Sequence, residues 1–224
     1  MREIVLDTET TGLDPDAGHR LIEIACIELL NHVPTGRVFH HAVDPEREVG
    51  EEAFAVHGIS TEMLRGKPLF AAIADEMLAF IGGDPLVIHN AEFDLKFINA
   101  ELRRCGKPAL EIPFIDTVAL ARKRFPGSPA SLDALCRRFA IDLSQRSKHG
   151  ARLDAELLAS VYLELIGGRQ PGLDFAAQAL AAAAGAAVER IMRPPRPHAP
   201  SAAELAAHAA FLAKLKAPIW LAEE

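Results

Sequence analysis

The stretch Ile4-Val5-Leu6-Asp7-Thr8-Glu9-Thr10-Thr11-Gly12 decides how the rest of the chain is interpreted. Its three apolar residues predict a short buried strand, and Thr11-Gly12 predicts a turn after it. Because side chains alternate along a strand, Asp7 and Glu9 at the strand's end point to the same face. Two acids at this spacing are a weak signal alone, and an ordinary strand end explains them more simply. The pair becomes informative only together with other acids in the chain.

The segments that follow predict a sheet with both antiparallel and parallel strands. Residues 21–30 and 37–43 have strand-like patterns, with a turn predicted at Pro34-Thr35-Gly36. Farther along, helical spacing of apolar residues predicts helices over residues 69–81, 93–102, 118–125, 132–139 and 152–166, with short strands at 86–88 and 114–115. Strands followed by alternating strands and helices predict an α/β fold, a mixed central sheet flanked by helices.

The composition indicates a protein that builds a hydrophobic core outside a membrane. Half of the 224 residues are hydrophobic, and no apolar run reaches the roughly 18 residues that a membrane span needs. The N-terminus does not resemble a signal peptide, because carboxylates follow its short apolar stretch at once. The cysteines lack CxxC spacing, which argues against disulfides or zinc and favours core residues in a reducing cytoplasm: Cys26, Cys105 and Cys136.

The formal net charge of −7 limits how this chain could bind a nucleic acid. Proteins that hold nucleic acid by their own electrostatic field are usually basic. If DNA is the substrate, a local basic patch, bound cations or a partner must therefore offset the repulsion.

Asp94 is the first acid that an ordinary surface position explains poorly. It falls in the first turn of a predicted helix, and its i+3 and i+4 neighbours are Phe97 and Ile98. A carboxylate on an apolar stripe is costly unless it is paired or bound to a metal. The alternative is a first-turn acid that faces solvent.

Asp154 repeats this pattern near the start of a later helix, where Leu157 and Leu158 share its face. His149 lies just before that helix. Five residues apart on one helix, the two side chains would point in different directions, so we expect His149 to project from the loop toward the same site. A lone surface histidine is the simpler interpretation if His149 is taken by itself.

Four acids at strand and helix ends, each next to apolar sequence, predict a metal site. Clustered carboxylate oxygens suit Mg²⁺ or Mn²⁺ better than zinc. Two such ions roughly 4 Å apart stabilise the attacking and leaving oxygens of a phosphodiester. Histidine, with a reference pKa near 6.5, suits the proton acceptor for the attacking water.

These residues resemble the DEDDh exonucleases of the DnaQ-like group, which have a ribonuclease H-like fold. The matching motifs are Asp7-Thr8-Glu9-Thr10-Thr11-Gly12, His89-Asn90-Ala91-Glu92-Phe93-Asp94 and the H-x-x-x-x-D pair of His149 and Asp154. Further stretches are similar to the epsilon-type proofreading subunits of bacterial DNA polymerase III, namely residues 55–59, 121–127 and 131–136. The resemblance extends from the first strand to Gly168, and its motifs are specific together rather than singly.

The resemblance implies a 3′→5′ exonuclease that removes mismatched 3′-terminal nucleotides and uses two Mg²⁺ or Mn²⁺ ions. Asp7 would bridge the metals, Glu9, Asp94 and Asp154 would complete the site, and His149 would be the general base. The residues implied to contact the DNA 3′ end are Thr8, Glu9, Thr10, Phe54, His57, Asn90 and Phe93. Each of these implied DNA-contact residues could instead be an ordinary loop or packing residue.

The sequence predicts three regions: an exonuclease domain over 1–168, a linker over 169–200, and a helical tail over 201–224. Together the last two form a flexible C-terminal tail. The linker is Pro-rich, which favours an extended spacer. Ser201 and Glu204 form a capping-box pattern, which predicts a helix to Lys216 that Pro218 ends.

Two parts of this tail suggest partners. Residues 170–175 fit the Q-x-x-L-x-F pattern of sliding-clamp motifs, with Gln170, Leu173 and Phe175 as contacts, although short motifs also match by chance. The capped helix resembles the segment that binds the polymerase III alpha subunit, through Leu205, Phe211 and Leu212, or it could fold back onto its own domain. A small accessory (theta-like) subunit is a further expectation from the resemblance.

Two other functions remain open at the level of sequence. A free-standing DEDDh exonuclease acting on RNA or short oligonucleotides would share the same pocket motifs. A non-catalytic scaffold within a polymerase complex would be expected to lack at least one metal ligand, and all four acids and the histidine are present.

Overall fold

The computed structural model describes residues 1–144, 146, 148–168 and 199–216. These fall into two units, Met1–Leu173 and Asp174–Glu224. Within the first unit a five-stranded sheet has the order β3-β2-β1-β4-β5. Its strands are β1 (Arg2–Thr10), β2 (Leu21–Leu30), β3 (Val33–Ala42), β4 (Leu86–Ile88) and β5 (Phe114–Asp116). The pairs among β1, β2 and β3 are antiparallel, whereas β4 is parallel to both β1 and β5, which confirms the mixed sheet.

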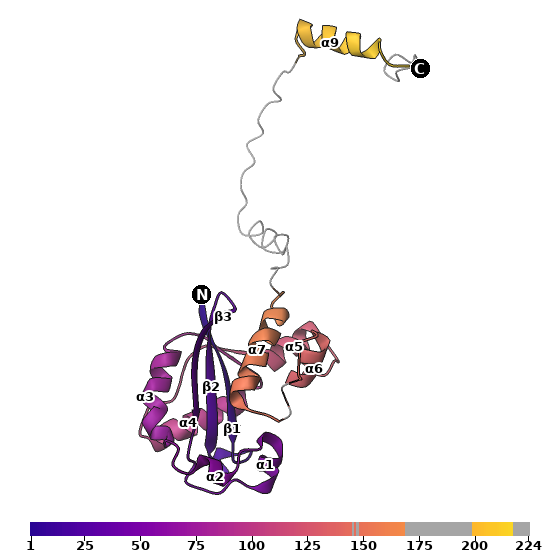
Figure 1. Cartoon of the computed structure of the whole chain (residues 1–224). Helices are drawn as coiled ribbons and strands as arrows, with labels where there is room; N and C mark the ends of the chain where they lie inside the picture. Colours follow the sequence, from indigo (N-terminus) through magenta and orange to yellow (C-terminus); the bar gives the residue numbers. More distant parts are fainter. Residues whose placement is uncertain (145, 147, 169–198, 217–224) are drawn as a thin grey trace. The chain divides into compact units, whose positions relative to one another are not determined.

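Helices cover both faces of this sheet (Figure 1). One face packs against α3 (Phe70–Ile81) and α4 (Ala91–Arg104), and the other packs against α5 (Thr117–Arg124), α6 (Leu132–Arg138) and α7 (Ala151–Leu165). The shorter helices are η1 (Pro15–Ala17), α1 (Glu51–His57) and α2 (Thr61–Leu64).

The central strand β1 divides its side chains between the two cores. Ile4 and Leu6 belong to the core under α3 and α4, while Val5 belongs to the core under α7. Because side chains alternate, Asp7 and Glu9 continue the face of Val5. The sheet register shifts between Glu9 and Thr10, an irregularity at the end of the strand that carries both acids.

The β2–β3 turn lies earlier than the sequence predicts. Pro34-Thr35-Gly36 belongs to β3, and the turn is formed by Asn31 and His32, both with positive φ (51° and 68°). The prediction was wrong because β3 is an edge strand, where a proline costs no sheet hydrogen bond. The first strand runs from Arg2 to Thr10 and includes both acids near its end, as predicted.

The helices α1 and α2 were not predicted from the sequence. Most side chains of α1 are exposed, so the helix lacks the apolar stripe that sequence periodicity detects. Instead, Ser60 caps α2 through a hydrogen bond from the Met63 amide, and Gly58 ends α1 with φ of 72°. These two short helices follow β3, and α1 provides part of the wall of the cavity that holds the acids.

The second unit contains α9 (Ala202–Leu212), and its predicted capping box is present. The Ser201 hydroxyl accepts a hydrogen bond from the Glu204 amide, and the Glu204 carboxylate accepts one from the Ser201 amide. The helix ends at Leu212, four residues before the predicted end, and Pro218 lies outside the described residues. Every residue of α9 except Leu212 is exposed.

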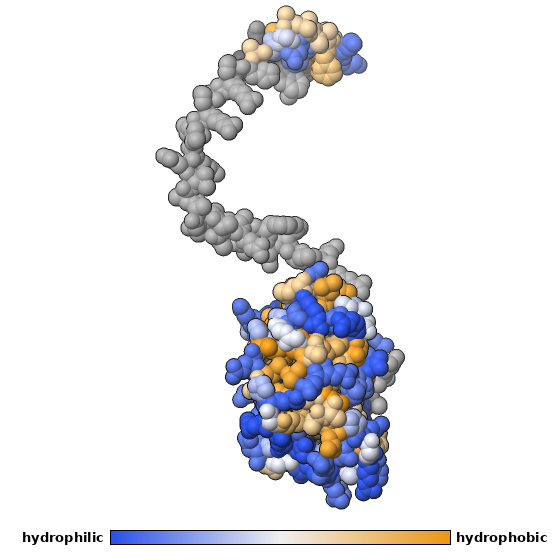
Figure 2. Space-filling model, turned by 90° about the vertical axis from the view of Figure 1, so that its left-hand side faces the viewer, coloured by the Kyte–Doolittle hydropathy of each residue, from blue (hydrophilic) through white to orange (hydrophobic). Residues whose placement is uncertain are grey.

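Figure 2 shows the face of the molecule that lies on the left of Figure 1, where α3 is found. Apolar surface gathers in the middle of this face and hydrophilic residues border it. Among the described residues, no helix is long and apolar enough to cross a membrane.

Candidate active site

The four predicted acids and the predicted histidine meet in one cavity of about 440 Å³. Asp7 and Glu9 come from β1, Asp94 from α4 and Asp154 from α7, while His149 lies in the segment before α7. The other lining residues are Thr8, Thr10, Gly12, Leu13, Ala53, Val56, His57, His89, Phe93, Ser131, Leu132, Asp133 and Arg146. Its volume lies within the range of roughly 300–1,000 Å³ that is usual for ligand sites.

Asp94 is buried at the start of α4 and tied to the central strand. The hydroxyl of Thr8 donates a hydrogen bond to Asp94 Oδ1 at 2.7 Å. The residue that begins the helix, Asn90, has φ of 69°, a left-handed conformation that asparagine tolerates better than most residues. The turn thus brings the first turn of α4 against the end of β1.

Asp154 is buried in the first turn of α7, and a second acid fixes where that helix begins. Gly150 provides no side-chain cap for α7. Instead, Glu23 of β2 accepts a hydrogen bond from the Ala151 amide at 2.9 Å. Since Glu23 pairs with Glu9 in the sheet register, the start of α7 is anchored beside the acids of β1.

His149 is half-exposed and lies outside α7, as predicted from its spacing to Asp154. Its Nδ1 lies 3.1 Å from Asp154 Oδ2 and 2.9 Å from Arg146 Nη2. A neutral ring can satisfy only one of these contacts, because Nδ1 either donates to the carboxylate or accepts from the guanidinium. The tautomer that donates to Asp154 leaves the Nε2 lone pair free to accept a proton.

The carboxylates carry more negative charge than the surrounding protein balances. Burial, together with the charges of Asp94 and Glu9, raises the pKa of Asp7 well above its ordinary value. Burial and nearby Asp154 raise the pKa of Glu9 to about 8. Burial raises the pKa of Asp94 to about 7, although the hydrogen bond from Thr8 opposes this. Burial acts in the same direction on Asp154, but the hydrogen bonds from Arg146 and His149, together with the charges of these two residues, outweigh it and lower the pKa of this acid.

Such a cluster fits hard divalent cations. Glu9, His149 and Asp154 each offer one ligand atom, and these atoms lie within 4.8 Å of one another. The carboxylate oxygens of this cluster suit Mg²⁺ or Mn²⁺. The pKa values of Asp7, Glu9 and Asp94 are raised because their negative charges are not balanced by the protein, and bound cations would balance them.

Four polar side chains of the cavity are not among the predicted site residues: His89, Ser131, Asp133 and Arg146. Arg146 contacts both Asp154 and His149, and Asp133 of α6 accepts a hydrogen bond from Arg146. Arg146 lies three residues before His149 in a polar loop, where an arginine normally indicates a solvated surface. Only the fold reveals that its side chain is 7% exposed.

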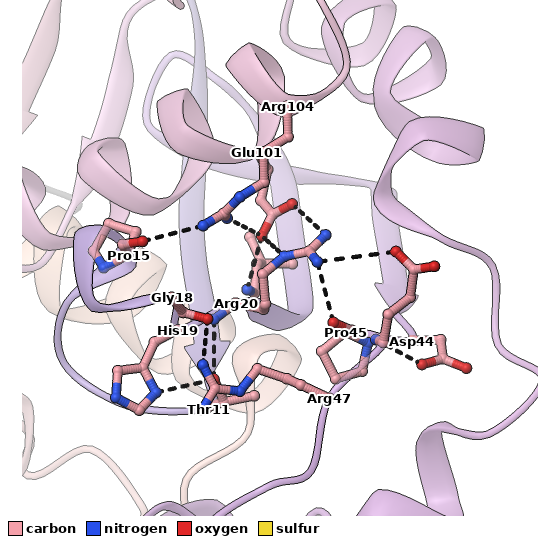
Figure 3. Close-up of polar contacts among 12 residues, drawn as sticks. Thr11, Pro15, Gly18, His19, Arg20, Asp44, Pro45, Arg47, Glu101 and Arg104 are labelled. Carbon is pink, nitrogen blue, oxygen red and sulfur yellow. Dashed lines mark hydrogen bonds and ion pairs between the residues drawn. The ribbon is translucent and has the colours of Figure 1, made fainter.

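The β1–β2 connection forms one wall of the cavity through Gly12 and Leu13, and a buried ion-pair network holds it. Figure 3 shows Arg20 and Arg104 directed at the carboxylate of Glu101. Arg20 donates to both Glu101 oxygens, at 2.7 and 2.9 Å, and Arg104 donates to Oε1 at 2.9 Å. The other nitrogen of Arg104 reaches the Pro15 carbonyl at 3.1 Å, so the network joins α4 to the connection.

The structure places only some of the predicted substrate-contact residues at this cavity. Thr8, Thr10, His57 and Phe93 line it, together with Glu9. Phe54 is not part of the lining, and its ring lies 4.7 Å from Lys148 Nζ. Asn90 is exposed and begins α4 without lining the cavity.

His57 has a hydrogen-bonding group available for a ligand. Its Nδ1 accepts a hydrogen bond from the Ile59 amide at 3.0 Å, which places the proton of the neutral ring on Nε2. This buried Nε2 has no hydrogen-bond partner among the described residues. A buried donor without a partner is costly, so a ligand acceptor would satisfy it.

Three of the predicted partner contacts lie on α9, and the other three lie outside the described residues. Leu205 and Phe211 are exposed on α9, at 54% and 56%, whereas Leu212 is buried. Gln170, Leu173 and Phe175 lie outside the described residues.

Comparison with known sequences identifies the family. Residues 4–162 match the exonuclease family RNase_T. DNA polymerase III subunit epsilon of Rickettsia conorii is 56% identical over 174 residues, which is 76% of this chain and 76% of that protein. The chain belongs to this exonuclease family. The epsilon subunit of Escherichia coli K12 is 48% identical over 185 residues, covering 79% of this chain and 76% of that subunit.

Solved exonuclease structures share the fold. Exonuclease X in complex with 5′ overhanging duplex DNA superposes with a TM-score of 0.58 at 26% identity, over 73% of this chain and 90% of that one. The nuclease domain of 3′hExo, a DEDDh family member bound to rAMP, gives a TM-score of 0.64 at 17% identity, over 74% and 91%. The chain is therefore a 3′→5′ exonuclease of the proofreading, epsilon type, with a ribonuclease H-like fold.

Proposed function

We propose that this exonuclease hydrolyses the 3′-terminal phosphodiester of DNA with two divalent cations, and that it proofreads for the replicative DNA polymerase III. The observation that carries the proposal is the convergence of Asp7, Glu9, Asp94, Asp154 and His149 on one cavity. The relatives' name, DNA polymerase III subunit epsilon, supports the polymerase association. Mg²⁺ and Mn²⁺ are both compatible with these donors.

Asp7, Glu9, Asp94 and Asp154 would hold the cations. When bound, the cations would stabilise negative charge on the attacking and leaving oxygens. His149 Nε2 would accept a proton from the attacking water while Nδ1 donates to Asp154. The water oxygen forms a bond to phosphorus, the bond from phosphorus to the neighbouring O3′ breaks, and that oxygen gains a proton. The products are a nucleoside 5′-monophosphate and a strand with a new 3′ hydroxyl.

Other cavity residues would hold the terminal nucleotide. The free Nε2–H of His57 can donate to an oxygen of the nucleotide, and Phe93 offers an apolar ring at the cavity wall. The β1 segment Thr8–Thr10 would hold the 3′ end. Phe54 and Asn90 could contact only parts of the DNA outside the cavity lining.

Discrimination against mismatches would need no recognition of sequence. A mismatched terminus unpairs at lower cost, so it reaches a single-strand cavity more often. A small cavity that contains cations can also work in a chain whose net charge is −7. A partner that delivers the DNA would supply the remaining affinity.

The test is degradation of three substrates in Mg²⁺: a 3′-mismatched primer–template, the fully paired duplex and a matched RNA oligomer. We expect nucleotides to leave one at a time from the 3′ end, fastest from the mismatched DNA. Faster degradation of RNA would support the free-standing RNA or oligonucleotide exonuclease instead. An inert chain would support the scaffold function.

We further propose that the tail carries two separate partner contacts, a clamp motif at residues 170–175 and a polymerase alpha contact on α9. Leu205 and Phe211 support the second contact, because they expose apolar side chains on a capped helix. A tether of this kind raises the local concentration of the nuclease beside its partner. A small accessory (theta-like) subunit remains a prediction from the resemblance.

Substitution in the tail should separate these two contacts. Phe211→Ala should weaken binding to the polymerase alpha subunit by about 30-fold, the effect of an interface residue worth ~2 kcal/mol. It should leave the affinity for the sliding clamp unchanged. The double variant Leu173→Ala with Phe175→Ala should weaken clamp binding and leave the affinity for the alpha subunit unchanged. Surface plasmon resonance on each purified partner measures both, with His208→Ala as an exposed control on α9. Equal affinities for all variants would place the contacts elsewhere.

A further inference from the structure

One cation of the chain itself lies inside the acid cluster. Arg146 donates to both oxygens of Asp154, from Nε to Oδ1 at 2.6 Å and from Nη2 to Oδ2 at 2.7 Å. Its Nη1 donates to Asp133 Oδ1, and its Nη2 approaches His149 Nδ1 at 2.9 Å. The guanidinium therefore contacts a proposed metal ligand, the proposed base and a residue of α6.

This arrangement restrains Asp154 more strongly than the helix backbone alone would. A planar guanidinium that binds both oxygens fixes the rotation of the carboxylate as well as its position. Asp133 holds the opposite edge of the guanidinium, which prevents Arg146 from turning with Asp154. With only 7% of its side chain exposed, Arg146 has little room to move away.

The position of Asp154 then affects His149. Asp154 Oδ2 lies 3.1 Å from Nδ1, and a hydrogen bond from Nδ1 to this carboxylate selects the ring tautomer that leaves Nε2 free, whereas a bond from Arg146 Nη2, 2.9 Å away, would select the other tautomer. Arg146 occupies part of the hydrogen-bonding capacity of both Asp154 oxygens, but each carboxylate oxygen has a second lone pair for a cation. The contacts of Arg146 are thus compatible with metal binding by Asp154.

We propose that Arg146 is a positioning residue of the exonuclease, which orients Asp154 for the divalent cation and thereby His149 for proton transfer. Such outer contacts of metal ligands typically change metal affinity or activity 10–100-fold when they are removed. Lysine would keep the charge of Arg146 but lose the paired hydrogen bonds. The inference rests on the proposed metal site.

The first experiment measures metal binding without turnover. Melting temperatures at a series of Mn²⁺ concentrations are fitted to a stabilisation of RT ln(1 + [Mn²⁺]/Kd), and the fitted Kd, the concentration at which half of the sites are filled, is called the Mn²⁺ midpoint. For Arg146→Lys we expect this concentration to rise 10–100-fold. The matched control is Arg2→Lys, because Arg2 lies at the start of β1, at the end of the strand opposite Asp7 and Glu9. Like Arg146, Arg2 makes several contacts: it donates to Glu28 at 2.6 Å, to the Ile81 carbonyl at 3.0 Å and to the Phe80 carbonyl at 2.5 Å. The control should lower the melting temperature equally at all Mn²⁺ concentrations.

The second experiment separates positioning from substrate binding. At saturating Mn²⁺, Arg146→Lys should lower kcat on mismatched DNA and leave KM nearly unchanged, because the guanidinium is already occupied by protein groups. Asp133→Asn removes the other anchor of Arg146 without changing a proposed ligand, and should shift the Mn²⁺ midpoint in the same direction by less. It provides the test if Arg146→Lys does not fold.

The Mn²⁺ midpoint and the kinetic constants decide whether Arg146 has the positioning role. An unchanged Mn²⁺ midpoint would make Arg146 a structural residue only. A lower midpoint would mean that Arg146 competes with the cation, and a raised KM with unchanged kcat would mean that it contacts DNA; both overturn the positioning role. If the unsubstituted chain shows no stabilisation by Mn²⁺ or Mg²⁺, the proposed metal site itself fails.

Discussion

Asp7→Asn should lower exonuclease activity by on the order of 10³-fold, the equivalent of several kcal/mol of lost transition-state stabilisation. Asp7 lies at the centre of the acid cluster, where its pKa responds to Asp94, Glu9 and Asp154. Asparagine keeps the shape of the side chain but loses the charge that would hold both cations. Initial rates on a 3′-mismatched primer–template measure the effect, and activity within tenfold of the unsubstituted chain would contradict it.

The same substitution should stabilise the metal-free protein. The pKa of Asp7 is raised in the folded chain, so ionisation of this acid disfavours folding as the pH rises above the unfolded pKa of about 4. The penalty is complete above the folded pKa and absent below pH 4. In EDTA, Asp7→Asn should therefore raise the melting temperature by several degrees at pH 8, and the gain should disappear toward pH 4. A gain that is independent of pH would mean that packing, rather than charge, is responsible.

His149→Gln should lower kcat by roughly 10²–10⁴-fold, the usual contribution of a general base, with little change in KM. Glutamine can still donate a hydrogen bond to Asp154, but it cannot accept a proton from water. The metal-dependent rise in melting temperature should persist, since Asp7, Glu9, Asp94 and Asp154 remain. This combination separates loss of the base from loss of the metal site.

The matched control is His41→Gln, because His41 lies on the edge strand β3 near Glu76 and does not line the cavity. It should retain full activity. If His149→Gln also retains activity within a factor of ten, another group accepts the proton, and the role assigned to His149 is wrong.

The parts of the fold that the sequence predicts well are those with strong apolar patterns. The strand Leu21–Leu30 and the short strand Leu86–Ile88 have the predicted bounds, because runs of buried β-branched and aliphatic residues define both. The α1 helix escaped prediction because its exposed side chains have no such pattern. Local sequence thus predicts the elements that face the core better than those that face the cavity.

The site shows the same division. Asp94 and Asp154 were predictable because an acid on an apolar stripe is unusual, and His149 because a helix could not direct it toward Asp154. Arg146 was not predictable, since its burial results from the packing of α6 and α7 rather than from its neighbours in sequence. Phe54 lies outside the cavity lining, with its ring beside Lys148, and its contact with the substrate stays a prediction.

The order of the acids along the chain also bears on how the enzyme is made. Asp7 and Glu9 lie on β1, which is synthesised well before α7, the helix that carries Asp154. The two elements pack directly against each other, so the core beneath α7 closes only after nearly the whole domain has been synthesised. A nascent or truncated chain that ends before residue 149 would carry Asp7, Glu9 and Asp94 but would lack His149 and Asp154. On the proposed roles of these residues, we expect nuclease activity only from chains that extend through α7.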